Sequence, residues 1–187
     1  TPAEAIGLGR ALEPFNLYFF EDPIEPENMD QWSWVAQQQP IPLAMGERLY
    51  TVYQFLDLLN HQGAAFVRPD LSLAGGITNV KKIAAIAEAN YVGVVPHNPL
   101  SCVLTAACVQ IDAATHNIPV QEYPHDDDKG IKAELVMEPL KRVGGYLEVP
   151  TKPGIGIELN EEAFKHYPPV PYERPALINA DGSLREY

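Results

Sequence analysis

The sequence predicts an α/β fold in which the strands of one parallel sheet alternate with helices. Five short apolar runs each end in an ionisable residue, namely Glu21, Glu47, Asp70, His97 and Glu122. These residues are separated by 47−21 = 26, 70−47 = 23, 97−70 = 27 and 122−97 = 25 positions. Between the runs, apolar residues recur every three or four positions, which is the period of an amphipathic helix. Strand, loop and helix therefore repeat with the rhythm of β/α units.

The helices expected between these runs begin at residues suited to helix starts. Thr1-Pro2-Ala3-Glu4 combines an N-cap Thr, a Pro in the first turn and a Glu that can close a capping box. Thr51-Val-Tyr-Gln54 has the pattern of a second capping box, and Ala74-Gly75-Gly76 predicts a turn before a helix. The five helices are expected near residues 1–12, 29–39, 51–59, 77–88 and 100–114.

Length and composition place limits on the class of protein. The chain has 187 residues, 46% of them hydrophobic, which is enough apolar material for one sizeable core. A net charge of −12 argues against nucleic acid or an anionic membrane as partner. Cys102 and Cys108 are predicted to be buried, reduced thiols, and no apolar run reaches the roughly 18 residues of a membrane span. The chain is therefore expected to be soluble and cytoplasmic.

The alternation of strands and helices stops after Glu122. Residues 1–123 are assigned to the sheet-forming part, and residues 124–187 to an extension that packs back on it or on a neighbouring domain. The extension contains the charged segment Asp126-Asp127-Asp128, predicted to be a solvated turn, and Asn160, predicted to cap a short helix at 161–166.

The five ionisable strand ends carry the chemistry. Side chains at the carboxyl ends of adjacent parallel strands converge on one mouth, so Glu21, Glu47, Asp70, His97 and Glu122 should face a common cavity. Four carboxylates this close would repel one another by about 1–4 kcal/mol per pair at 4 Å. A divalent cation, Mg²⁺ or Mn²⁺, would relieve that repulsion, because these ions prefer carboxylate oxygens. Any single carboxylate could instead serve only as an ion-pair partner in a loop.

His97 and Asp70 form a candidate dyad, in which the carboxylate orients the imidazole and raises its basicity. The other four histidines are assigned no role, and both tryptophans are assigned to packing; these residues are His61, His116, His125, His166, Trp32 and Trp34.

Several motifs, taken as an ordered set over nearly the whole chain, resemble the barrel domain of the enolase superfamily in its mandelate racemase-like branch. They are Glu21-Asp22-Pro23, Gly46-Glu47, Pro69-Asp70-Leu71 with Gly75-Gly76-Ile77, Pro96-His97 and Gln121-Glu122. Within that branch the Pro96-His97-Asn98-Pro99 loop, Glu122-Tyr123 and the 145–158 segment are most similar to the galactonate and related acid-sugar dehydratases. The resemblance implies the C-terminal portion of a (β/α)7β TIM-like barrel, with about five strands.

The resemblance also implies roles for the five strand-end residues. Glu21 and Glu47 would be the second and third carboxylate ligands of Mg²⁺. His97 with Asp70 would be the general base that removes the proton α to the substrate carboxylate, and Glu122 would hydrogen-bond the developing enediolate. Loss of the β-hydroxyl would then give a 2-keto-3-deoxy acid. The alternatives are a racemase or epimerase of the same branch, or a non-catalytic relative.

In this family a first metal-ligand Asp lies one strand before the strand that bears Glu21, and a capping domain precedes the barrel. The chain is accordingly expected to be the C-terminal part of a longer protein, with its partners being a sugar-acid substrate, the N-terminal part of the same protein and further copies in a homo-oligomer.

Overall fold

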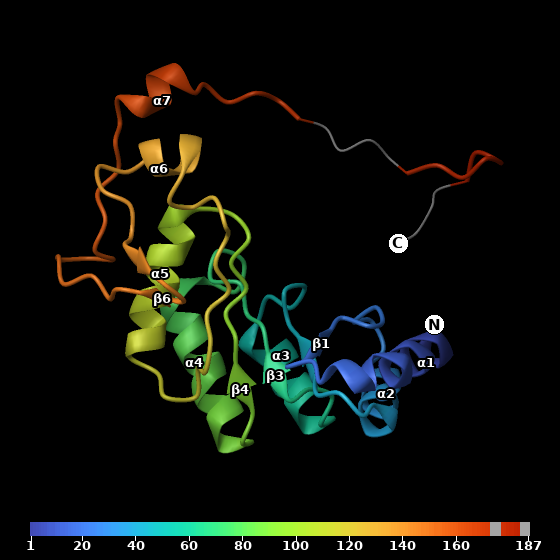
Figure 1. Cartoon of the computed structure of the whole chain (residues 1–187). Helices are drawn as coiled ribbons and strands as arrows, with labels where there is room; N and C mark the ends of the chain where they lie inside the picture. The colour runs from blue at the N-terminus through green and yellow to red at the C-terminus, as the bar shows by residue number, and fades with distance from the viewer. Residues whose placement is uncertain (173–176, 184–187) are drawn as a thin grey trace.

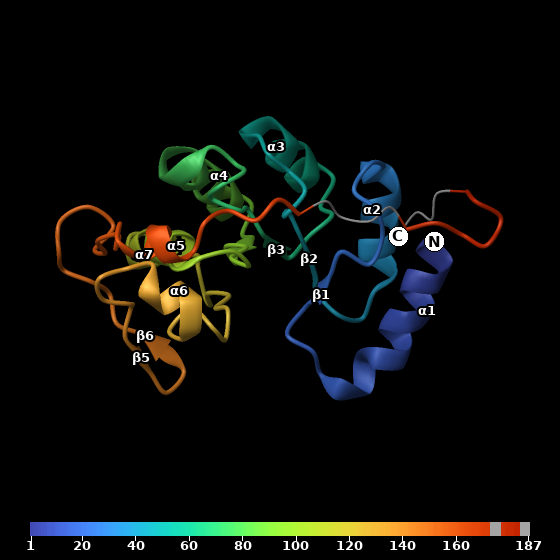
Figure 2. The same ribbon diagram turned by 90° about the horizontal axis from the view of Figure 1, so that it is seen from above.

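The computed structural model describes residues 1–172 and 177–183 and contains a parallel sheet of four strands in the order β1-β2-β3-β4. The strands are β1 (Phe20–Glu21), β2 (Leu43–Met45), β3 (Phe66–Val67) and β4 (Gly93–Val94). Sequence order equals spatial order, as expected of consecutive β/α units. Strands form the inner layer of an arc and helices the outer layer (Figure 2). The predicted α/β fold is confirmed.

Helices precede and connect the strands. They are α1 (Pro2–Leu12), the 3₁₀ turn η1 (Glu13–Phe15), α2 (Met29–Gln38), α3 (Val52–Asn60), α4 (Gly76–Ala89) and α5 (Cys102–Ala113). Both predicted capping boxes form, with Thr1 and Glu4 at the start of α1 and Thr51 and Gln54 at the start of α3. Because each side chain of a box satisfies a backbone N–H of the other residue, these sequence signals fix the two helix starts locally.

The core lies between the sheet and the inner faces of α2 to α5. Trp32 is fully buried and donates a hydrogen bond from Nε1 to the Glu25 carbonyl over 3.0 Å. Trp34 is 45% exposed, so the packing role predicted for this residue is wrong: in α2 it lies on the solvent side. Cys102 and Cys108 are free and buried, as predicted.

The predicted fifth strand at Pro119–Glu122 is not formed. Val94 of β4 donates its N–H to the Asn117 carbonyl over 2.8 Å, which begins a pairing with this segment. Pro119 follows without an N–H, so the ladder of hydrogen bonds cannot continue in regular form. The Gln121 side chain bonds the Pro96 carbonyl instead, over 3.2 Å, so the segment runs beside β4 as extended chain.

Beyond residue 123 the described chain contains α6 (Gly130–Glu134), the antiparallel hairpin β5 (Arg142–Val143) and β6 (Tyr146–Leu147), and α7 (Ala163–His166). These elements lie at the α5 end of the arc, and the described chain after α7 runs back across the molecule toward the side of α1 and α2 (Figures 1 and 2). The predicted cap at Asn160 is wrong: α7 begins after Glu162, and Asn160 donates from its side chain to the Glu134 carbonyl over 3.0 Å. That bond ties Asn160 to α6.

Candidate active site

Glu21 and Glu47 lie at the same edge of the sheet. Glu21 is the last residue of β1 and pairs in register with Ala44, and Glu47 follows β2 after Gly46. Gly46 has φ +152°, and a Cβ at this position would lie 2.7 Å from the backbone nitrogen of Arg68. A glycine is therefore needed for the chain to turn closely over β3 and present Glu47 at the strand ends.

Asp70 and His97 extend the pairing of β3 and β4 through an isolated parallel bridge. His97 Nδ1 lies 3.0 Å from Asp70 Oδ2, and the other oxygen of Asp70 accepts the backbone N–H of Ser72 over 2.7 Å. The Asp70 side chain is only 1% exposed, so its orientation is fixed on both sides. The structure thus forms the pair that the sequence predicted.

His97 also contacts a second carboxylate, since its Nε2 lies 3.1 Å from Glu47 Oε2. In the neutral ring, a hydrogen on Nδ1 that is donated to Asp70 leaves a lone pair on Nε2. Nε2 is thus the ring nitrogen that does not face Asp70, and it lies toward Glu47 at the ends of the strands.

Arg68 contacts two of the predicted site residues, Glu21 and Glu122. The sequence pattern did not predict this role of Arg68. Its side chain is 4% exposed; Nε contacts Glu21 Oε1, and Nη2 donates to Glu122 Oε2 over 2.6 Å. The only signal in the sequence is an arginine inside an otherwise apolar strand run, where burial requires a charged partner. Arg68 brings Glu122 to the strand ends although the segment before Glu122 is not a strand.

Burial and neighbouring charges raise the pKa of two acidic side chains at this edge of the sheet, Glu21 and Asp22. Burial raises the pKa of Glu21, Arg68 opposes that shift, and the neighbouring charges of Glu47 and Glu122 add to it. Burial likewise raises the pKa of Asp22 to about 6, against the opposing effect of Arg48. Burial is the main cause of both shifts, and neighbouring carboxylates add a smaller part by disfavouring one another's charge.

The donors present fit part of a site for a hard divalent cation. Glu21 and Glu47 offer carboxylate oxygens from neighbouring strands, and Asp22 Oδ1 is buried without a hydrogen-bond partner in the described part of the chain. Among residues 1–172 and 177–183, however, no group of three or more His, Cys, Asp or Glu side chains is arranged to hold a metal ion. The two glutamates would therefore bind such an ion only with further ligands.

Glu122 is held by a buried neighbour as well as by Arg68. The Asn98 backbone N–H donates to Glu122 Oε2 over 2.8 Å, and the Asn98 amide donates to the Glu122 carbonyl over 3.0 Å. Asn98 is 0% exposed, and it follows His97 directly in the chain. The sequence pattern did not predict a role for it.

The prediction of a solvated turn at residues 126–128 is wrong for the middle residue, Asp127. Asp127 is 3% exposed and contacts the hydroxyl of Thr105, while Lys132 lies 2.8 Å from Asp126 Oδ1 and 3.5 Å from Asp127 Oδ1. A lysine and a threonine compensate the buried charge, which a run of three acidic residues does not reveal in sequence.

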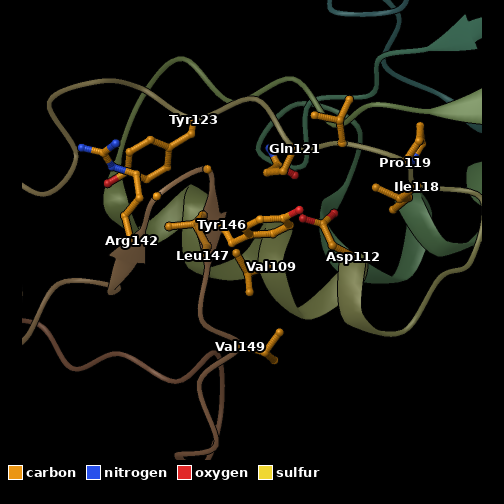
Figure 3. Close-up of a pocket in the computed structure, with 13 residues that line it drawn as sticks. Val109, Asp112, Ile118, Pro119, Gln121, Tyr123, Arg142, Tyr146, Leu147 and Val149 are labelled. Atoms are coloured by element: carbon orange, nitrogen blue, oxygen red, sulfur yellow. The ribbon is translucent and has the colours of Figure 1, made fainter.

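A separate cavity of about 450 Å³ lies between α5, residues 118–123 and the β5–β6 hairpin (Figure 3). Its lining is mainly apolar, and Asp112 points into it. None of the five predicted site residues lines this cavity.

The sequence and the structure of the chain both match known proteins. Residues 1–163 match the family model described as Enolase C-terminal domain-like. A D-galactonate dehydratase from Variovorax paradoxus (strain S110) is 39% identical over 96% of this chain and 49% of its own length. A D-galactonate dehydratase from Xanthomonas campestris pv. campestris (strain B100) is 38% identical over 98% of this chain and 50% of its own. The chain thus spans about half the length of these curated relatives.

Two solved structures extend the comparison. An enolase from Agrobacterium radiobacter with bound Na and L-malate has a TM-score of 0.89 and 37% identity, over 98% of this chain and 50% of its own. A mandelate racemase/muconate lactonizing enzyme from Jannaschia sp. CCS1 has a TM-score of 0.87 and 34% identity, over 92% of this chain and 44% of its own. A four-stranded parallel sheet with ionisable residues at its carboxyl edge is part of such a barrel.

The chain belongs to the Enolase C-terminal domain-like family, and the resemblance predicted from its motifs is confirmed. Within the described residues, no helix is both long enough and apolar enough to cross a membrane.

Proposed function

We propose that the protein to which this chain belongs dehydrates a sugar acid, by removing the proton α to the carboxylate and expelling the β-hydroxyl as water. The observation that carries the proposal is the buried Asp70–His97 pair, whose Nε2 lies at the same strand ends as Glu21, Glu47 and Glu122. The relatives named D-galactonate dehydratase support an aldonate as the substrate class.

His97 takes the α-proton on Nε2. Asp70 accepts the hydrogen on Nδ1 throughout and so keeps the lone pair on the other nitrogen. Once the proton has moved, Asp70 and Glu47 each face one N–H of the imidazolium, which stabilises the charged ring. Asp70 is buried and both of its oxygens are hydrogen-bonded, one to Ser72 and one to His97, so it holds the imidazole ring in one orientation.

The electrons of the broken C–H bond pass to the substrate carboxylate, which becomes an enediolate with two negative oxygens. Glu21 and Glu47 would hold Mg²⁺, or Mn²⁺, which when bound supplies positive charge to such oxygens. Glu122 would hydrogen-bond the same group. Collapse of the enediolate breaks the bond to the β-hydroxyl, which leaves as hydroxide; together with the proton taken up by His97, it makes up the one water lost per substrate. The resulting enol then moves its O–H hydrogen to the β-carbon and becomes a 2-keto-3-deoxy acid.

The test uses the protein expressed from its complete gene. We expect turnover of at least one member of a panel of aldonic and aldaric acids, with the keto product measured colorimetrically. Incubation in D₂O should place deuterium at the α-carbon if any substrate carbanion returns. His97→Asn should abolish both signals, because no other described side chain pairs with Asp70 as a base.

His116→Asn is the matched control, because His116 is exposed and its one ion pair within the described residues is with Glu88, over 3.6 Å. It should leave turnover within about twofold of the wild type. Exchange without loss of water would identify a racemase or epimerase, and full activity of His97→Asn would refute the assignment of the base. Removal of divalent ions with EDTA should stop turnover, and Mg²⁺ should restore it.

A further inference from the structure

A chain of buried polar groups leads away from Glu122. Asn98 bonds Glu122 twice, from its backbone N–H to Oε2 and from its side-chain amide to the carbonyl. The same amide donates to Thr105 Oγ1 over 2.8 Å. Because both groups facing the amide nitrogen accept hydrogen bonds, only its NH₂ end satisfies them, and this fixes the orientation of the Asn98 side chain.

The hydrogen bonds in this series of buried groups all donate in one direction. Thr105 is 1% exposed, and its hydroxyl carries a single hydrogen, for which the Ser101 carbonyl at 3.2 Å and the carboxylate of Asp127 compete. The carboxylate is the stronger acceptor, because it is charged. Asn98 therefore donates to Thr105 and Thr105 donates to Asp127, and hydrogen bonds aligned in this way strengthen one another.

The two oxygens of Glu122 are not equivalent. Oε2 accepts from Arg68 and from the Asn98 backbone, whereas no described residue offers a hydrogen bond or ion pair to Oε1. Oε1 is therefore the oxygen that remains available to hydrogen-bond a substrate.

We propose that Asn98 is a positioning residue, anchored through Thr105 to Asp127, that holds Oε2 of Glu122 and so directs Oε1 to the substrate. The proposal rests on the proposed function for the role of Glu122. It also connects the strand ends to the segment after residue 123, because Asp127 lies in that segment and contacts α5 through Thr105.

The kinetic test compares Asn98→Ala with Asn117→Ala in the protein expressed from its complete gene. Asn117 is the matched control: its amide also donates to two acceptors, the carbonyls of Ala84 and Val92, but it contacts none of the site residues. Asn98→Ala should lower kcat by about 10- to 100-fold with KM within about threefold. Asn117→Ala should change kcat by less than about threefold.

A double-mutant cycle separates positioning from a general structural effect. In a Glu122→Gln background, Asn98→Ala should lower the remaining kcat by less than about threefold, because the group that it positions has been altered. An undiminished effect in that background would overturn the proposal. Thr105→Val keeps both bonds from Asn98 to Glu122 and removes only the anchor, so it should lower kcat by a smaller factor than Asn98→Ala does; an unchanged kcat would remove Thr105 and Asp127 from the proposal.

Crystal structures of the variants decide the question even if no sugar acid is turned over. In Asn98→Ala, or in Thr105→Val if the first variant does not fold, the Glu122 carboxylate should adopt more than one orientation. A single unchanged orientation would overturn the positioning role. Absence of turnover by the wild-type protein would refute the proposed function alone, so the two failures are distinguishable.

Discussion

Asp112 provides a test of how burial controls charge in this fold. It lies near the end of α5 and points into the cavity beside Tyr146 (Figure 3), and its Oδ1 is buried with no hydrogen-bond partner in the described part of the chain. Burial raises its pKa from the ordinary 3.8 to about 7. Because the folded state binds this proton more tightly than the unfolded state, ionising Asp112 destabilises the fold.

The pKa difference determines the size of the effect. A raised carboxyl pKa means that stability falls as the pH rises from about 4 to about 7 and then levels off. Linkage gives a cost of roughly 4 kcal/mol at pH 8 and roughly 1.5 kcal/mol at pH 5, as upper bounds for a partly buried group. Asp112→Asn removes the charge at nearly constant volume. Its stability relative to the wild type should therefore improve by up to about 2.5 kcal/mol between pH 5 and pH 8.

Urea unfolding at pH 5, 6, 7 and 8, followed by circular dichroism, measures this difference. Asp126→Asn is the control with the opposite sign: a hydrogen bond from Lys132 lowers the pKa of Asp126, so its charge stabilises the fold above about pH 4. Asp126→Asn should therefore be less stable than the wild type at every pH of the series. A stability difference between Asp112→Asn and the wild type that is the same at pH 5 and pH 8 would refute the reasoning.

Three further substitutions should each lower the free energy of unfolding, measured by urea denaturation. Arg68→Met should cost about 3 kcal/mol, because it leaves Glu21 and Glu122 without their shared cation, and equal stability would mean that solvent already screens both carboxylates. Gly46→Ala should cost about 1–3 kcal/mol, since its Cβ would overlap backbone atoms of Arg68, and a neutral result would show that the turn can shift. Thr51→Ala should cost about 1 kcal/mol through loss of the capping box, whereas Thr51→Ser should be nearly neutral; equal losses would contradict the cap.

The elements predicted most accurately from sequence are those specified by local signals. The starts of α1 and α3 depend on side chains within four residues of each other, and both form as expected. The sheet edge could be predicted because parallel strands in consecutive β/α units all point the same way. The ends of such strands therefore meet whatever the intervening helices contain, and Asp70 and His97 meet as predicted.

The predictions that were wrong concern residues whose interaction partners are distant in sequence. Pro119 interrupts the expected fifth strand, because whether a strand tolerates Pro depends on which of its edges is paired. Asn160 is a residue type that often caps helices, but its side chain donates to the Glu134 carbonyl in α6. Asp127 was predicted to be solvated, but it is buried and accepts a hydrogen bond from the Thr105 hydroxyl. In each case the residue type was informative, whereas its partner was determined by the tertiary fold.

The charge at the strand ends supports the proposed chemistry independently of the relatives. Arg68 contacts Glu21 and Glu122, and His97 contacts Glu47 and Asp70. Four carboxyl groups thus stand against one guanidinium, an excess of 4 − 1 = 3 acidic groups. Such a cluster would repel a sugar acid, which is itself an anion, by about 1–4 kcal/mol for each unit charge at 4 Å. An anionic substrate can therefore approach His97 only with additional positive charge, and the two glutamates next to Arg68 and His97 offer the oxygen ligands that a divalent cation requires.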